Sequence, residues 1–132
     1  MFNNIWEEEN AFPYPYTEMS LEESRLIRYL VRNFYAFRNG ELITMTLKNT
    51  NGIVLANGSV YEKNKNKTFN SEIEYIDNGM VFYSEIEEAP SKRYYSIDEF
   101  IFMEKDIEVR SKINGRNIIR KIPYESEDRE LK

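Results

Sequence analysis

Residues 41–60 read ELITMTLKNTNGIVLANGSV. The Asn-Gly dipeptide at positions 51 and 52 divides this stretch into two halves in which apolar and polar residues alternate. Asn-Gly readily adopts the two positive φ angles of a type I′ turn, which joins the strands of a two-residue β-hairpin. Counting outward from the turn gives the pairs Leu47 with Ala56, Met45 with Gly58 and Ile43 with Val60. One face of the hairpin is therefore apolar or small, as expected for a ribbon with one buried face.

Two further Asn-Gly dipeptides, at 78–79 and 114–115, predict hairpins in the same way. Around the first, Phe82 falls on an apolar face, whereas Glu72 lies directly opposite Glu85 on the other face. Around the second, Glu108 lies opposite Lys121. The apolar face of that last hairpin carries Ile107, Val109, Ile113, Ile118 and Ile122. The register is consistent in all three hairpins, which predicts an antiparallel, β-rich domain.

A helix is predicted before the first hairpin. Ser20-Leu21-Glu22-Glu23 has the pattern of a capping box, in which Ser20 and Glu23 satisfy free backbone N–H groups at a helix start. Apolar residues follow with helical spacing at positions 26, 27, 30, 31 and 34. The helix should end near Phe37-Arg38, because Asn39-Gly40 is a stop signal.

We expect three segments along the chain. Residues 1–19 form an extended, acidic arm rich in Pro and Tyr, which either packs on the domain or becomes ordered on a partner. Residues 20–122 form a single domain, and residues 123–132 form a charged tail. Within the domain, residues 62–67 indicate a polar loop, and residues 94–103 a short helical or 3₁₀ turn followed by a last short strand. The predicted core consists of Leu26, Leu30, Phe34, Ile43, Met45, Leu47, Val60, Ile73, Phe82 and Ile86.

The predicted fold class is α+β. An N-terminal helix packs on a small, strongly curved antiparallel β-barrel of SH3-like or Sm-like type, with an additional C-terminal β-hairpin. Three segments carry a resemblance to a known family: LITMTLKNTNG at 42–52, GSVYEK at 58–63 and SIDEFIFME at 96–104. Over roughly residues 20–104 the chain resembles the YolD-like family of Gram-positive bacteria and their prophages. The resemblance implies an accessory protein, associated with DNA repair or damage-tolerant DNA synthesis, without catalytic residues of its own.

The composition excludes most catalytic chemistry. The 132 residues include no Cys and no His, which removes thiol nucleophiles, the commonest general base and the commonest metal ligand. Carboxylates remain, and Glu72 opposite Glu85 is the best candidate pair, because like charges across a sheet normally destabilise it. A solvated outer face is the alternative reading of this pair. We therefore predict a protein that is not an enzyme and that binds no cofactor and no metal.

Neither a secretory signal nor a membrane anchor is indicated. No apolar stretch approaches the roughly 20 residues that cross a bilayer, and no basic and apolar leader opens the sequence. An aromatic content of 14% favours a packed domain over a disordered chain. We therefore expect a cytoplasmic protein with no membrane partner.

Basic residues are segregated along the chain, although its formal charge is −5. Arg25, Arg28 and Arg32 share one face of the predicted helix. A second group, Lys63, Lys65 and Lys67, lies in the predicted polar loop. A third group lies in the C-terminal hairpin and comprises Lys105, Arg110, Lys112, Arg116, Arg120 and Lys121. If these groups converge, they form a binding face for nucleic acid or for an acidic protein. If they diverge, they are ordinary surface residues.

Three hypotheses for the function follow, in this order. The first is a non-catalytic accessory or regulatory protein, encoded on a mobile element or phage, that binds a protein partner. The second is an acidic inhibitor of phage type, acting on a nucleic-acid-handling enzyme. The third is direct nucleic-acid binding through the basic C-terminal hairpin. The candidate partner-binding residues are Arg25, Arg28, Arg32, Arg110, Lys112, Arg116 and Arg120, together with Glu72 and Glu85. The sequence leaves the oligomeric state open.

Overall fold

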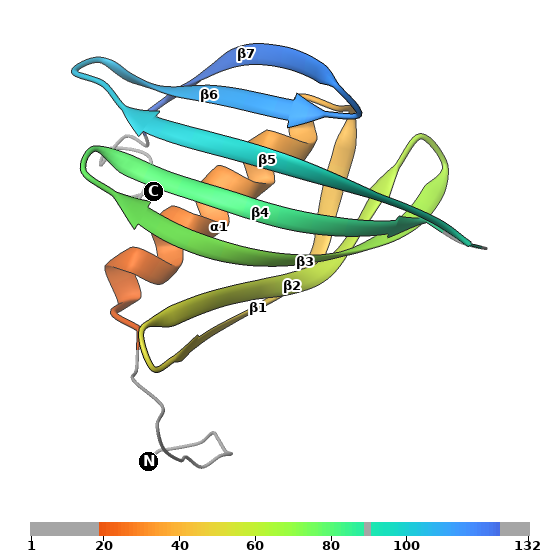
Figure 1. Ribbon diagram of the computed structural model, residues 1–132, viewed down its shortest axis with the longest axis horizontal. Coiled ribbons are helices and arrows are strands. Elements are labelled where there is room, and N and C mark those ends of the chain that lie inside the picture. Colours follow the sequence, from red (N-terminus) through yellow and green to blue (C-terminus); the bar gives the residue numbers. More distant parts are fainter. Residues whose placement is uncertain (1–18, 89–90, 125–132) are drawn as a thin grey trace, which may run out of the picture.

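The computed structural model describes residues 19–88 and 91–124, which form one helix and seven strands. The elements are α1 (Leu21–Ala36), β1 (Gly40–Thr50), β2 (Ile53–Glu62), β3 (Lys65–Ile76), β4 (Gly79–Glu88), β5 (Lys92–Phe102), β6 (Asp106–Ile113) and β7 (Arg116–Pro123). All seven strands belong to one antiparallel sheet, in which each strand pairs with its neighbours in the sequence (Figure 1). Residues 1–18 of the predicted arm and residues 125–132 of the predicted tail lie outside the described residues.

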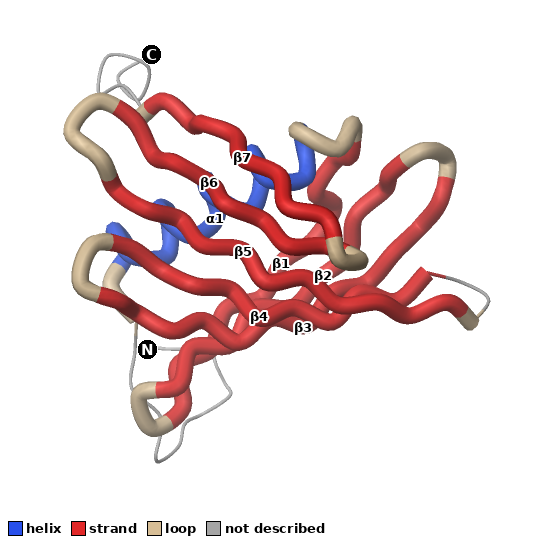
Figure 2. Tube along the Cα trace, turned by 45° about the horizontal axis from the view of Figure 1, so that its top comes forward, coloured by secondary structure: helices blue, strands red, loops and turns tan. Residues whose placement is uncertain are grey.

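The sheet is strongly curved and wraps around α1, which crosses its concave side (Figure 2). We call the side that faces α1 the inner face and the opposite side the outer face. The helix reaches both edges of the sheet, because Arg28 Nη1 donates to Met45 O in β1 at 3.3 Å and Tyr29 OH donates to Pro123 O in β7 at 2.7 Å. The predicted α+β class is confirmed, but the sheet is open rather than closed into a barrel.

The helix begins and ends where its sequence signals predict. Glu23 N donates to Ser20 Oγ at 3.1 Å, and the Glu23 carboxylate reaches back to the backbone of Ser20, which completes the capping box. After Ala36, Asn39 adopts a φ of 60° and ends the helical path. No helix in the described part of the chain is long and apolar enough to cross a membrane.

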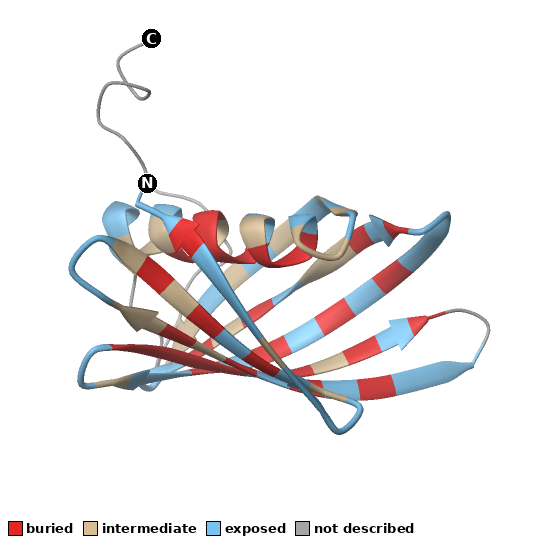
Figure 3. Ribbon diagram, turned by 90° about the horizontal axis from the view of Figure 1, so that it is seen from above, coloured by how far each residue is buried: buried red, intermediate tan, exposed pale blue. Residues whose placement is uncertain are grey.

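The core lies between α1 and the inner face (Figure 3). Of the predicted core residues, Leu30, Phe34, Val60, Ile73, Phe82 and Ile86 are buried, and Leu26, Met45 and Leu47 are half-buried. Ile43 is 54% exposed, so the prediction that it belongs to the core was wrong. A β-bulge between Leu42 and Thr44 explains the error, because it places Leu42 opposite Val60 and turns Ile43 outward.

Two of the three predicted Asn-Gly turns are correct, at 51–52 and 114–115, where all four φ angles are positive. The turn predicted at Asn78-Gly79 was wrong: Ile76 pairs with Gly79, so Asp77 and Asn78 form the turn. Gly79 serves a different purpose within β4. A Cβ atom at this position would lie 1.9 Å from Phe100 O, so only glycine allows β5 to approach so closely.

Two segments were predicted as irregular but are regular β-structure. In the predicted polar loop at 62–67, Lys63 and Asn64 have φ angles of 53° and 64°, and they form a tight turn between β2 and β3. The predicted 3₁₀ turn lies within β5, which is continuous from Lys92 to Phe102. Its buried positions alternate as in any strand, but two of them are the polar residues Ser96 and Asp98. Hydrophobic periodicity alone therefore missed this strand.

Candidate functional site

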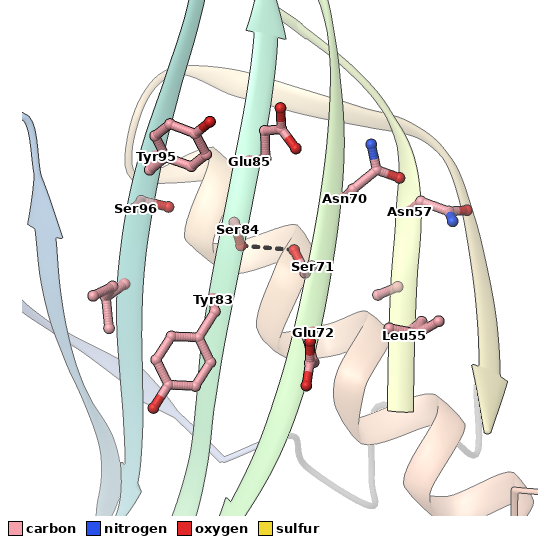
Figure 4. Close-up of a pocket in the computed structure, with 12 residues that line it drawn as sticks. Leu55, Asn57, Asn70, Ser71, Glu72, Tyr83, Ser84, Glu85, Tyr95 and Ser96 are labelled. Atoms are coloured by element: carbon pink, nitrogen blue, oxygen red, sulfur yellow. Dashed lines mark hydrogen bonds between the residues drawn. The ribbon is translucent and has the colours of Figure 1, made fainter. Parts of the chain in front are cut away.

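The outer face of the sheet is hollowed across β2, β3, β4 and β5 (Figure 4). Because paired residues of adjacent strands share a face, the register arranges the outward side chains in two rows. The first row comprises Leu55, Glu72, Tyr83 and Ile97, and the second comprises Asn57, Asn70, Glu85 and Tyr95. These eight residues define the outer-face hollow, whose volume is about 560 Å³.

Large side chains in the outer-face hollow are exposed. Tyr95 is 63% exposed, Tyr83 45% and Ile97 43%. Beneath them the hydroxyl groups of Ser71 and Ser84 form a hydrogen bond of 2.6 Å, which joins β3 to β4 below the hollow. The exposed side chains are therefore held on the central strands of a hydrogen-bonded sheet rather than on a loop.

Carboxylates surround Tyr83. Its hydroxyl donates to Glu74 Oε1 at 3.0 Å, and this hydrogen bond, with the charges of Glu74, Glu99 and Glu72, raises the pKa of Tyr83 above its ordinary value. Glu85 pairs with Arg93, with an Nε–Oε2 distance of 2.9 Å. Neither Glu72 nor Glu74 forms an ion pair with any residue that the structure describes. The centre of the outer face is therefore acidic.

Glu72 and Glu85 both lie in the outer-face hollow, but the prediction that they face one another was wrong. Glu72 lies opposite Tyr83, and Glu85 lies opposite Asn70. The cause is the turn at Asp77-Asn78, which shifts the register by two residues. A shift of two keeps every side chain on its predicted face but changes its partner. Among residues 19–88 and 91–124, no three carboxylates are close enough together to hold a metal ion.

The predicted basic groups do not converge. Arg28 is half-buried against β1, and Arg25 and Arg32 are exposed on α1, on the inner side of the sheet. Arg110 and Lys112 point to the outer face, because Val109 and Ser111 alternate with them and are buried. Across the last hairpin, Arg120 pairs with Val109 and Arg116 with Ile113, so both lie on the inner-face side. The basic residues are thus distributed over opposite sides of the molecule.

A largely buried group of four charged side chains and one tyrosine lies on the inner face, near the end of β2, the start of β3, the end of β4 and the start of β5. We call Arg38, Glu62, Lys67, Glu88 and Tyr94 the ion cluster. Lys67 Nζ lies 3.4 Å from Glu62 Oε1, 3.7 Å from Glu88 Oε1 and 3.1 Å from the Tyr94 hydroxyl. Arg38 pairs with Glu62 at 3.3 Å and also donates to Tyr94. Burial alone would lower the pKa of Lys67, but Tyr94 and Glu62 outweigh it and raise that pKa.

Asp98 is the second buried ionisable feature of the inner face. It is 2% exposed, it accepts a hydrogen bond of 3.0 Å from Ser96, and its Oδ1 atom has no hydrogen-bond partner among the described residues. Burial raises the pKa of Asp98 to about 6, and the hydroxyls of Ser111 and Ser96 and the charge of Arg38 offset only part of this effect. The ionised form of Asp98 is therefore disfavoured in the folded protein.

Replacing Asp98 by Asn is expected to stabilise the protein at neutral pH and not at pH 4. The folded pKa, about 6, exceeds the unfolded value of about 3.9. The stability associated with the protonated group is therefore complete below about pH 4 and is lost as the pH rises through about 6. Asp98→Asn avoids this loss. The free energy of unfolding of the variant relative to wild type should therefore be about 2 kcal/mol higher at pH 7.5 than at pH 4. Urea unfolding of both proteins across this range measures the difference, and a difference independent of pH would contradict the prediction.

Comparison with known proteins finds no matching family model, no matching curated protein and no matching solved structure. The resemblance to the YolD-like family stays a prediction. Function is therefore inferred from the geometry of this chain. Sequence reasoning found Glu72 and Glu85 but missed Tyr83, Tyr95 and Ile97. Tyr83 could have been found, because it follows the predicted core residue Phe82 in a strand and must therefore point outward.

Proposed function

We propose that the protein is a cytoplasmic, non-catalytic accessory or regulatory factor that binds a protein partner through the outer-face hollow. The observation that carries this proposal is the exposure of Tyr83, Tyr95 and Ile97 together on one rigid sheet face. Solvent-facing sheet surfaces normally carry polar side chains. Tyr is enriched in protein interfaces, because its ring provides a large, rigid contact area and its hydroxyl group can form a hydrogen bond.

The chemistry of the chain also favours binding over catalysis. A sequence without Cys and His lacks the usual nucleophile and base pairs. The outer-face hollow presents amide, carboxylate, phenol and aliphatic side chains, and the hydroxyl groups of Ser71, Ser84 and Ser96 at its base have no histidine to activate them. An acidic inhibitor of a nucleic-acid-handling enzyme is one form of this function, which the carboxylates around Tyr83 support. Direct nucleic-acid binding has less support, because the basic side chains of the last hairpin lie on two faces.

The test uses two single Tyr variants. Immobilised protein is incubated with a lysate of the organism that encodes it, and retained proteins are quantified against the immobilised chain. Wild type is expected to retain one protein stoichiometrically, and Tyr95→Ser should weaken that complex about 30-fold, as for an interface hot spot worth about 2 kcal/mol. The matched control is Tyr61→Ser, because Tyr61 is 42% exposed and lies outside the hollow. Equal retention by wild type and Tyr95→Ser, or retention of nothing by wild type, would refute the proposal.

A further inference from the structure

We propose that the partner presents an extended basic segment, which lies along β3 and β4 in the outer-face hollow. This inference rests on the proposed function and adds the chemistry and orientation of the bound segment. Its basis is the unbalanced charge at the centre of the outer face. Glu72 and Glu74 are exposed on β3 without an ion pair among the described residues. The half-buried Glu99 on β5 adds less to this charge, because it lies opposite Arg110 on β6.

The arrangement of charge sets the direction of the segment. Across the strands, the row through Glu72 and Tyr83 continues to Lys48 on β1 at one side and to Lys112 on β6 at the other. A basic segment that crossed the sheet would therefore meet cations at both ends. Along the strands, by contrast, Glu74 and Glu72 follow each other on β3. The row across the strands through Glu74 carries a second carboxylate, Glu99, but it also reaches a cation, Arg110 on β6. The line along β3 therefore favours a cationic segment more than either row across the sheet does.

The spacing of the carboxylates matches an extended peptide. Glu72 and Glu74 are two residues apart on one strand, which corresponds to about 6.6 Å. Alternate residues of an extended segment have the same spacing, so Lys or Arg at every second position would face successive carboxylates. The ring of Tyr83, exposed on β4 opposite Glu72, can also take up a cation by cation–π contact. The segment thus meets both charge and aromatic surface.

The inference is tested with a synthetic probe. A fluorescent ten-residue peptide in which Lys and Thr alternate is titrated with the full-length protein at low ionic strength, and polarisation is measured. Wild type is expected to bind it, and Glu72→Gln/Glu74→Gln should weaken binding at least about tenfold. The matched control is Glu22→Gln/Glu41→Gln, which removes the same charge at exposed positions outside the hollow. A peptide of the same composition with the sequence KKTTKKTTKT, in which no two Lys residues are two positions apart, should bind less tightly, because it cannot place Lys opposite both Glu72 and Glu74 on one side of an extended segment.

Three outcomes would overturn the inference: no binding by wild type, equal weakening in both Gln double variants, or equal affinity for the alternating peptide and for KKTTKKTTKT. Equal weakening would mean that only the net charge of the protein matters. The proposed function is judged separately, from lysate retention by wild type and Tyr95→Ser. If a partner depends on Tyr95 but is retained equally by Glu72→Gln/Glu74→Gln, the function stands and the basic segment is wrong. If the peptide binds as expected but wild type retains no partner, the outer face binds an extended basic segment and the proposed function is wrong.

Discussion

Replacing Lys67 by Met is expected to lower the free energy of unfolding by about 3–5 kcal/mol, the usual cost of breaking a buried ion pair from one side. The Lys67 side chain is 7% exposed, and its ammonium group lies between Glu62 and Glu88. Met fills a similar volume but leaves the carboxylate of Glu62, which is 2% exposed, with Arg38 alone. Urea unfolding measures the loss.

Lys65→Met is the matched control for this substitution. Lys65 is on the same strand, and its Nζ atom lies 2.6 Å from Glu88 Oε2, but its side chain is 59% exposed. Glu88 is only 7% exposed, but its partner Lys65 is solvated and Lys67 remains beside the carboxylate, so the control should cost about 1 kcal/mol or less. If the two variants lost the same free energy, the burial assigned to the ion cluster would be wrong. A double variant, Glu62→Gln/Lys67→Met, should cost less than the sum of the two single changes, because the two side chains interact directly.

The local signals in the sequence were sufficient for the helix and for two turns. The capping box at Ser20 and the Asn-Gly dipeptides at 51–52 and 114–115 act within a few residues, so no knowledge of the rest of the chain is needed to interpret them. Asn78-Gly79 has the same sequence but a different structure. Gly79 is required by the close approach of Phe100 O from β5, which is a contact between strands. A dipeptide signal cannot reveal such a contact.

Buried polar residues account for the strands that were missed. Glu62, Lys67 and Glu88 lie on the inner face, where hydrophobic patterning predicts apolar residues. The segment that contains Glu62 and Lys67 therefore resembled a solvated loop. Ser96 and Asp98 are polar residues at buried positions of β5, so the apolar alternation that would have predicted this strand is interrupted there. Glu62, Lys67 and Glu88 can be buried because they pair across strands, and such pairing is visible only once the sheet is assembled. Asp98 is buried with a hydrogen bond from Ser96 of the same strand.

The sequence was sufficient to predict on which face of the sheet Glu72 and Glu85 lie, but not which residues they pair with on the neighbouring strands. Glu72 and Glu85 were placed correctly on the outer face, because a register shift of two residues preserves the alternation of faces. The tyrosines were missed for two reasons. Tyr95 lies in β5, which was predicted as irregular, and Tyr83 was not distinguished from the many other aromatic residues of the chain. The convergence of both on one hollow depends on the pairing of β4 with β5.

Replacing Phe82 by Ala is expected to cost about 3–5 kcal/mol, as for other large-to-small changes in a packed core. Phe82 is 4% exposed on the inner face, and its ring centroid lies 4.9 Å from that of Phe100. The adjacent residue supplies the control: Tyr83 points to the outer face and is 45% exposed, so Tyr83→Ala should cost about 1 kcal/mol or less. Neighbouring residues in a strand point to opposite faces, so the two variants together test which face of β4 is buried. A loss below about 1 kcal/mol for Phe82→Ala, with a large loss for Tyr83→Ala, would mean that the faces are exchanged and that the outer-face hollow is part of the core.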